Sequence, residues 1–145
     1  MKLDDLKMQI LAQHNFIRAL LVNVADLAQR VSEGDTSCEG KLRDVSHELA
    51  WALLRHMDDE ERTLGELVRE GHAPSAIHLA EFAHNHVHQR ELLAHFDGRV
   101  DRVQSPKRLG EIVEALTHAV ALDMENEEVA IFGEGSFLPA RPLAS

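Results

Sequence analysis

His56 and Glu60 lie four residues apart, in a stretch where apolar residues recur every three or four positions. On a helix this spacing places both side chains on one face, one turn apart. That face is otherwise apolar and carries Leu42, Val45, Leu49, Leu53, Leu64 and Leu67. A buried polar side chain without a partner costs about 1–3 kcal/mol. A metal ion is one suitable partner, because imidazole nitrogens and carboxylate oxygens are both ligand atoms.

Four segments of the chain show helical periodicity, and none shows sustained strand alternation. Glycine, proline and short polar runs separate the segments, as expected of helix ends. The predicted helices span about residues 3–31, 37–70 (or 41–70), 74–103 and 105–132. Short connections between amphipathic helices predict an all-α fold, an antiparallel up-down-up-down four-helix bundle. Residues 1–133 would form this single domain, and residues 134–145 an extended or disordered tail.

The composition of the 145-residue chain limits its partners. A net charge of −10 argues against nucleic acid, because neutralising phosphates would need a basic face. No apolar run is long enough for a membrane span, and the acidic N-terminus lacks the apolar core of a signal peptide. The single cysteine, Cys38, excludes an internal disulfide and fits a reducing compartment. We therefore expect a cytoplasmic protein that binds neither nucleic acid nor membranes.

The polar groups within the apolar stripes are predicted to meet at one level of the bundle. Counting residues from the connections between the helices, at about 1.5 Å per residue, gives each group a height along the bundle. The predicted layer consists of His14, His56, His84 and Asp123, with Glu60 and Glu127 one helical turn further along.

The sequence also repeats itself. His14-Asn15 recurs as His84-Asn85, and the run from His56 to Glu61 recurs as the run from Asp123 to Glu128. The offsets of 70 and 67 residues indicate a duplicated helical hairpin with unequal loops. In the second copy an aspartate, Asp123, takes the position of the histidine.

Six buried polar groups without partners would cancel the stability of a typical domain, about 5–15 kcal/mol. Bound cations remove this cost, because the imidazoles and carboxylates become ligands. A mixed set of histidines and carboxylates suits iron, manganese or zinc better than calcium or magnesium. The candidate ligands outnumber those of a tetrahedral zinc site, and two carboxylates can bridge, so a dinuclear site is favoured.

This pattern resembles the hemerythrin family, including its branch of HHE cation-binding domains. The matching residues, over about residues 3–132, are His14, His56, Glu60, His84, His88, His118 and Asp123. The resemblance implies a non-haem site with two Fe ions, bridged by carboxylates and an oxo or hydroxo group, with Zn or Mn as substitutes. It further implies a protein that binds dioxygen or a similar diatomic ligand, or that senses oxygen, iron or redox state, rather than an enzyme.

Two ligand sets are open within this resemblance. The set of the hemerythrins proper has His84, His88 and His118 on one iron, His14 and His56 on the other, and Glu60 and Asp123 as bridges. In the set of the HHE branch, Asp123 replaces a histidine of the fourth helix and Glu127 becomes the bridge. The internal repeat and the residue count favour the HHE set.

Other interpretations were weighed against this one. A ferritin-like di-iron site needs Glu-x-x-His on two helices, and only Glu81-x-x-His84 has that spacing. Glu81 is instead a possible hydrogen-bond acceptor for a ligating imidazole. A metal-stabilised interaction module and a di-iron oxidoreductase acting on oxygen or peroxide are the alternative functions. The remaining histidines are expected to be exposed or structural; they are His47, His72, His78, His86 and His95.

Overall fold

The computed structural model describes residues 3–71 and 76–132. Four long helices make up nearly all of this part: α1 (Leu3–Ser32), α2 (Glu39–Arg69), α3 (Ala76–Arg102) and α4 (Pro106–Phe132). A short 3-10 helix, η1 (Thr36–Cys38), precedes α2. Within the described residues there is no strand, so the predicted all-α class is confirmed. The helices begin and end within about two residues of the predicted bounds, and the predicted tail over residues 134–145 lies outside the described residues.

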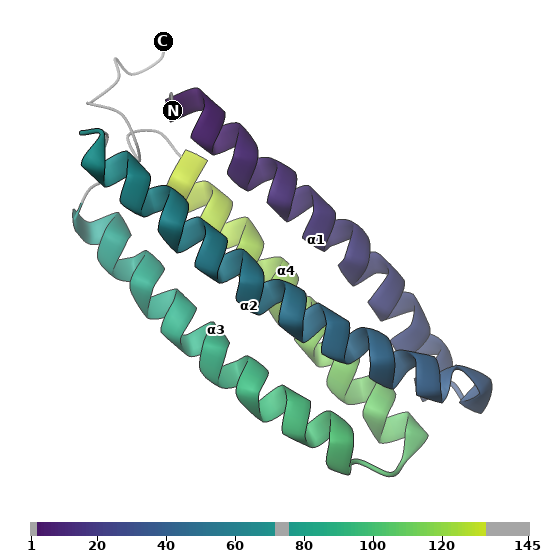
Figure 1. Ribbon diagram of the computed structural model, residues 1–145. Helices are drawn as coiled ribbons and strands as arrows, with labels where there is room; N and C mark the ends of the chain where they lie inside the picture. The colour runs from purple at the N-terminus through teal and green to yellow at the C-terminus, as the bar shows by residue number, and fades with distance from the viewer. Residues whose placement is uncertain (1–2, 72–75, 133–145) are drawn as a thin grey trace.

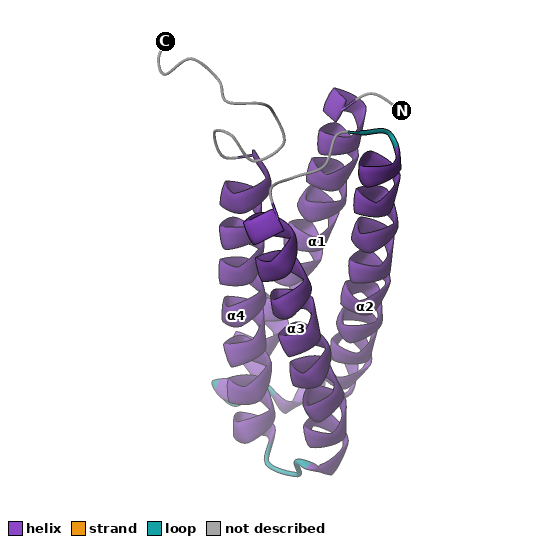
Figure 2. Ribbon diagram, turned by 90° about the vertical axis from the view of Figure 1, so that its left-hand side faces the viewer, coloured by secondary structure: helices purple, strands orange, loops and turns teal. Residues whose placement is uncertain are grey.

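The four helices lie side by side with their long axes roughly aligned (Figure 1). The α1–α2 and α3–α4 connections lie at one end of the molecule, while the first turn of α1 and the last turn of α4 lie at the other. Figure 2 shows α3 between α4 and α2. Helix α1 packs against α2 and α4, and α3 packs against the same two helices. Side chains from all four helices can therefore meet in one core.

Each helix buries the stripe that its periodicity predicts. On α1 the buried residues follow one another at intervals of three or four, which places them on a single face; they are Ile10, His14, Ile17, Leu21, Val24, Ala28 and Val31. Helix α1 makes its most extensive contact with α4. Gly110 permits this approach, because a Cβ there would lie 2.5 Å from the carbonyl oxygen of Ala28. The polar member of the α1 stripe thereby faces α4.

The helix ends follow from local sequence. Gly34 and Gly71 have φ values of 112° and 83°, which glycine adopts without steric cost, and both directly follow helical segments. The Ser105 hydroxyl accepts a hydrogen bond from the backbone N–H of Arg108 at 3.2 Å, and Pro106 is the first residue of α4. Among the described helices, none is long and apolar enough to cross a lipid bilayer.

Candidate metal centre

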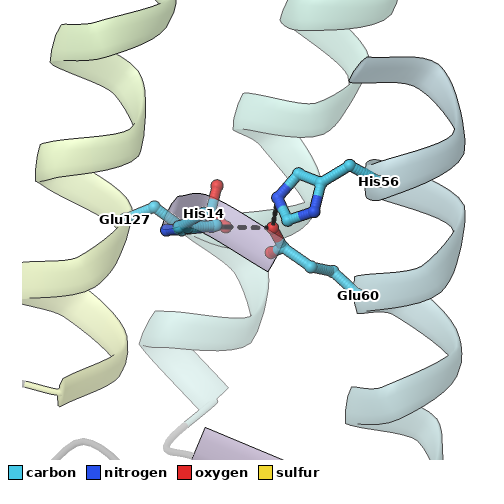
Figure 3. Close-up of side chains that lie close together, drawn as sticks. All are labelled: His14, His56, Glu60 and Glu127. Carbon is cyan, nitrogen blue, oxygen red and sulfur yellow. Dashed lines mark hydrogen bonds and ion pairs between the residues drawn. The ribbon is translucent and has the colours of Figure 1, made fainter. Parts of the chain in front are cut away.

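Buried polar groups gather at one level of the core, as the sequence predicts. One ligand atom each from His14, His56, Glu60 and Glu127 lies within 4.8 Å of all the others, and all four side chains are buried. Figure 3 shows His56 and Glu60 projecting from α2 toward Glu127 on α4, with His14 of α1 between them. A buried group of this composition and size can hold a metal ion.

The imidazole of His14 links the two carboxylates. Its Nε2 lies 3.0 Å from Oε1 of Glu60 and 3.2 Å from Oε1 of Glu127. The His56 Nε2 is in contact with the same Glu60 Oε1, and the rings of His14 and His56 meet edge to face with centroids 4.8 Å apart. Two imidazoles and two carboxylates thus converge on one point.

Helix α3 contributes a fifth residue, His86, which is 1% exposed. Its Nε2 lies 3.8 Å from Oε2 of Glu60 and 3.9 Å from Oε2 of Glu127. Two ligand atoms that each lie about 2.1 Å from one metal ion are separated by roughly 3–4 Å, so these distances suit a shared ion. We call His14, His56, Glu60, His86 and Glu127 the central cluster.

The outer nitrogens of two imidazoles are held by acceptors. His56 Nδ1 donates to the amide oxygen of Gln13 at 3.1 Å, and His86 Nδ1 donates to Oε1 of Glu61 at 3.0 Å. With the proton on Nδ1, the Nε2 lone pair faces the carboxylates inside the cluster. Metal-ligating histidines are held in this way, because the outer hydrogen bond fixes both tautomer and ring orientation.

Two inward-facing atoms of the central cluster have no hydrogen-bond partner: Nε2 of His56 and Oε2 of Glu60. A buried polar atom left in this state costs about 1–3 kcal/mol. A cation between the imidazoles and carboxylates would bind both atoms. The residues present therefore fit a metal ion.

The protonation of the cluster shows what a cation would displace. Burial alone would lower the pKa of His14, but hydrogen bonds to Glu127 and Glu60 raise it to about 9. Burial and the neighbouring Glu127 raise the pKa of Glu60. For Glu127, burial is outweighed by hydrogen bonds to Glu60, His14 and His86, which lower its pKa. At neutral pH the protonated His14 bridges the carboxylates, and a metal ion would take the place of its proton.

Four residues of the predicted ligand sets lie elsewhere. His84, His88 and His118 are exposed, and Asp123 is half-buried, so the central cluster includes none of them. Burial raises the pKa of Asp123, against the opposing effect of His88. The side chain of Glu81 lies outside the described residues, as do His72 and His78.

The expectation for α3 was displaced by two residues. His84 was expected in the core layer and His86 at an exposed or merely structural position, whereas His86 is buried and His84 exposed. Two residues correspond to about 200° around a helix, so the two side chains point to nearly opposite faces. The buried residues Leu93, Phe96 and Val100 continue the face of His86 at helical spacing.

A signal for His86 is present in the sequence. His14-x-x-x-Arg18 recurs as His86-x-x-x-Arg90, with an offset of 72 residues. Aligning the repeat on these two pairs, rather than on His14-Asn15 and His84-Asn85, selects the buried histidine.

No family model matches the chain, and no curated protein or solved structure is significantly similar to it. The fold and the central cluster are therefore the basis for assigning a function.

Proposed function

We propose that this protein is a non-haem di-iron protein, a hemerythrin-like antiparallel up-down-up-down bundle that binds dioxygen or senses oxygen, iron or redox state. The observation that carries the proposal is the central cluster itself, in which four helices supply three buried imidazoles and two buried carboxylates. A mixed set of nitrogen and oxygen ligands suits iron, with zinc or manganese as substitutes.

The orientation of the two carboxylates supports two ions rather than one. Glu60 and Glu127 both direct Oε1 toward His14, at 3.0 and 3.2 Å. Both direct Oε2 toward His86, at 3.8 and 3.9 Å. Each carboxylate thus spans the gap between two imidazoles, which is the arrangement of a bridging ligand. His14 and His56 would hold one ion, and His86 the other.

Bound iron would supply reversible oxidation and an open position for a diatomic ligand; the chain supplies the shaped and buried environment. Glu60 is fully buried, and His14 and His86 are no more than 1% exposed. Such burial keeps bulk water from the centre and strengthens electrostatic interactions within it. These properties favour binding a small apolar gas.

Metal analysis of protein purified without added zinc tests the proposal. We expect about two irons per chain and an oxygen-dependent charge-transfer absorption in the near ultraviolet. His56→Ala and Glu60→Ala should lose most of the metal, whereas His95→Ala, an exposed control on α3, should retain it. A wild-type protein without transition metal would contradict the proposal.

The reaction of the reduced protein with oxygen, followed by stopped flow, separates the possible roles. A stable and reversible adduct is the result expected of storage or transport. Rapid autoxidation is the result expected of a sensor or redox protein.

One observation favours the alternative function, an oxidoreductase. A cavity of about 680 Å³ lies between α1 and α2, and its lining includes Gln13, Phe16, Trp51 and His56. An apolar organic molecule in this cavity would lie beside the central cluster. Because Trp51 is the only tryptophan, its fluorescence would report binding. Turnover of peroxide with an aromatic reductant would support this function, and its absence would favour oxygen binding alone.

A further inference from the structure

Two arginines lie just outside the central cluster, one on each side. Arg18 of α1 pairs with the carboxylate of Glu128 on α4: Nη1 donates to Oε1 at 3.0 Å, and Nη2 contacts Oε2. The same Oε2 lies 3.6 Å from Nδ1 of His14. Arginine, carboxylate and imidazole therefore form a chain that ends at the central cluster.

The second chain begins at Arg90 of α3. Its guanidinium grips Glu61 of α2 with two hydrogen bonds, Nη1 to Oε1 at 2.7 Å and Nη2 to Oε2 at 3.0 Å. A further bond joins Nη2 to Asp58 at 2.9 Å. Oε1 of Glu61 accepts the Nδ1 proton of His86 at 3.0 Å. This chain has the same order of groups as the first.

The two chains occupy equivalent positions in the duplicated hairpins. In each, the arginine follows its histidine by four residues, which places both on one helix face. In each, the carboxylate is the residue directly after a glutamate of the central cluster. One chain joins α1 to α4 and the other joins α3 to α2, so each crosses between the two hairpins. A surface ion pair formed by chance would not explain the same geometry at both positions.

Stability alone does not explain these pairs. The arginine side chains are 39% and 35% exposed, and ion pairs at such positions contribute little to folding. Their geometric effect is larger. A bidentate guanidinium holds both oxygens of a carboxylate in one plane and one orientation. A carboxylate fixed in this way keeps a proton on the imidazole nitrogen it faces, and so directs the other nitrogen inward.

We propose that Arg18 and Arg90 are positioning residues of the metal centre, which act through Glu128 and Glu61 to orient His14 and His86 toward the ions. The role in metal binding rests on the proposed function, whereas the orientation of His86 is a property of the metal-free protein as well.

The first test compares iron affinity, by chelator competition, with the unfolding midpoint of the metal-free protein. Arg18→Gln and Arg90→Gln should weaken binding about 10–100-fold and leave the midpoint nearly unchanged. Arg90→Lys keeps the charge without the bidentate grip and should recover part of the affinity. Arg62→Gln is the control, because Arg62 pairs with Asp59 on the surface of α2 and contacts no histidine. Its affinity should stay within about twofold of the wild type.

The second test needs no metal. In the metal-free wild type, the hydrogen-bonded Nδ1 proton of His86 should be protected from exchange and visible by NMR, and Arg90→Gln should speed its exchange. If Arg90→Gln exposes this proton while the wild type binds no metal, the positioning role stands and the proposed function fails. If metal affinity and the Nδ1 proton are both unchanged in Arg90→Gln, the inference is overturned. It is also overturned if affinity falls only in proportion to a loss of folding stability.

Discussion

The two hairpins of the molecule, α1–α2 and α3–α4, bring equivalent residues to the core from opposite sides. His14 corresponds to His86, Glu60 to Glu127, Glu61 to Glu128 and Arg18 to Arg90. The hairpins differ at one position: α2 carries the buried His56, whereas α4 carries the half-buried Asp123. The α1–α2 side of the centre thus has an imidazole that the α3–α4 side lacks.

The equivalent carboxylates differ as well. The pKa of Glu60 is raised by burial and by its neighbour Glu127, whereas the pKa of Glu127 is lowered by hydrogen bonds to Glu60, His14 and His86. Duplicated residues have therefore acquired unequal electrostatic environments. The comparison indicates two unequal metal positions, one richer in nitrogen and the other in oxygen.

The largest expected effect follows from removing a feature that both hairpins share. Glu60→Gln and Glu127→Gln keep the side-chain shape but remove the charge of a proposed bridge. Because each bridge would serve both ions, either substitution should abolish binding of both, as measured by metal analysis. Loss of only one ion from Glu127→Gln would show that this carboxylate serves a single position.

A smaller and unequal effect is expected at the position where the hairpins differ. His56→Ala should remove about one ion per chain, because the imidazole faces the cluster directly. Asp123→Ala should leave the metal content unchanged and weaken affinity by less than about tenfold, within the range of substitutions around a ligand set. Equal losses in the two variants, measured by chelator competition, would show that Asp123 is a ligand equivalent to His56.

The pH dependence should follow His14, whose pKa is about 9 in the folded protein against a usual value of 6.5. Its contribution to the stability of the metal-free protein is therefore fully present below about pH 6.5 and lost as the pH rises through about 9. Because a metal ion must displace this proton, apparent affinity should rise up to about tenfold per pH unit below pH 9. Calorimetry in buffers of different protonation enthalpy measures the released proton. Binding without proton release would mean that His14 does not ligate the ion.

The smallest effects are expected at the exposed histidines that resemble hemerythrin ligands. His84→Ala, His88→Ala and His118→Ala should change metal content and absorption spectrum by less than the error of the measurement, because these side chains lie outside the central cluster. A variant among these three that loses iron would identify its histidine as a ligand and revise the set on that helix.

Much of this architecture could be predicted from the sequence. Apolar periodicity located all four helices, because each buries one stripe, and the repeat of the run from His56 to Glu61 located Glu127. The error at His84 arose from aligning the repeat on the pair His-Asn. His86 lies 17 residues before Val103, as His14 lies 17 before Val31, while His84 lies 19 before Val103. The residue count therefore contained the correct answer.

The outer contacts could not be predicted in the same way. The pairs Arg18–Glu128 and Arg90–Glu61 join helices distant in sequence, and charged residues at these positions are equally compatible with a solvated surface. Their partners depend on how the helices pack and on the rotation of each helix about its axis, which periodicity fixes only to within a residue or two.

Anomalous diffraction at the iron edge, from crystals of iron-loaded protein, tests the central claim most directly. We predict two peaks between Glu60 and Glu127, one beside His14 and His56 and the other beside His86. No peak at the central cluster, or peaks beside His84 and His88 instead, would contradict it.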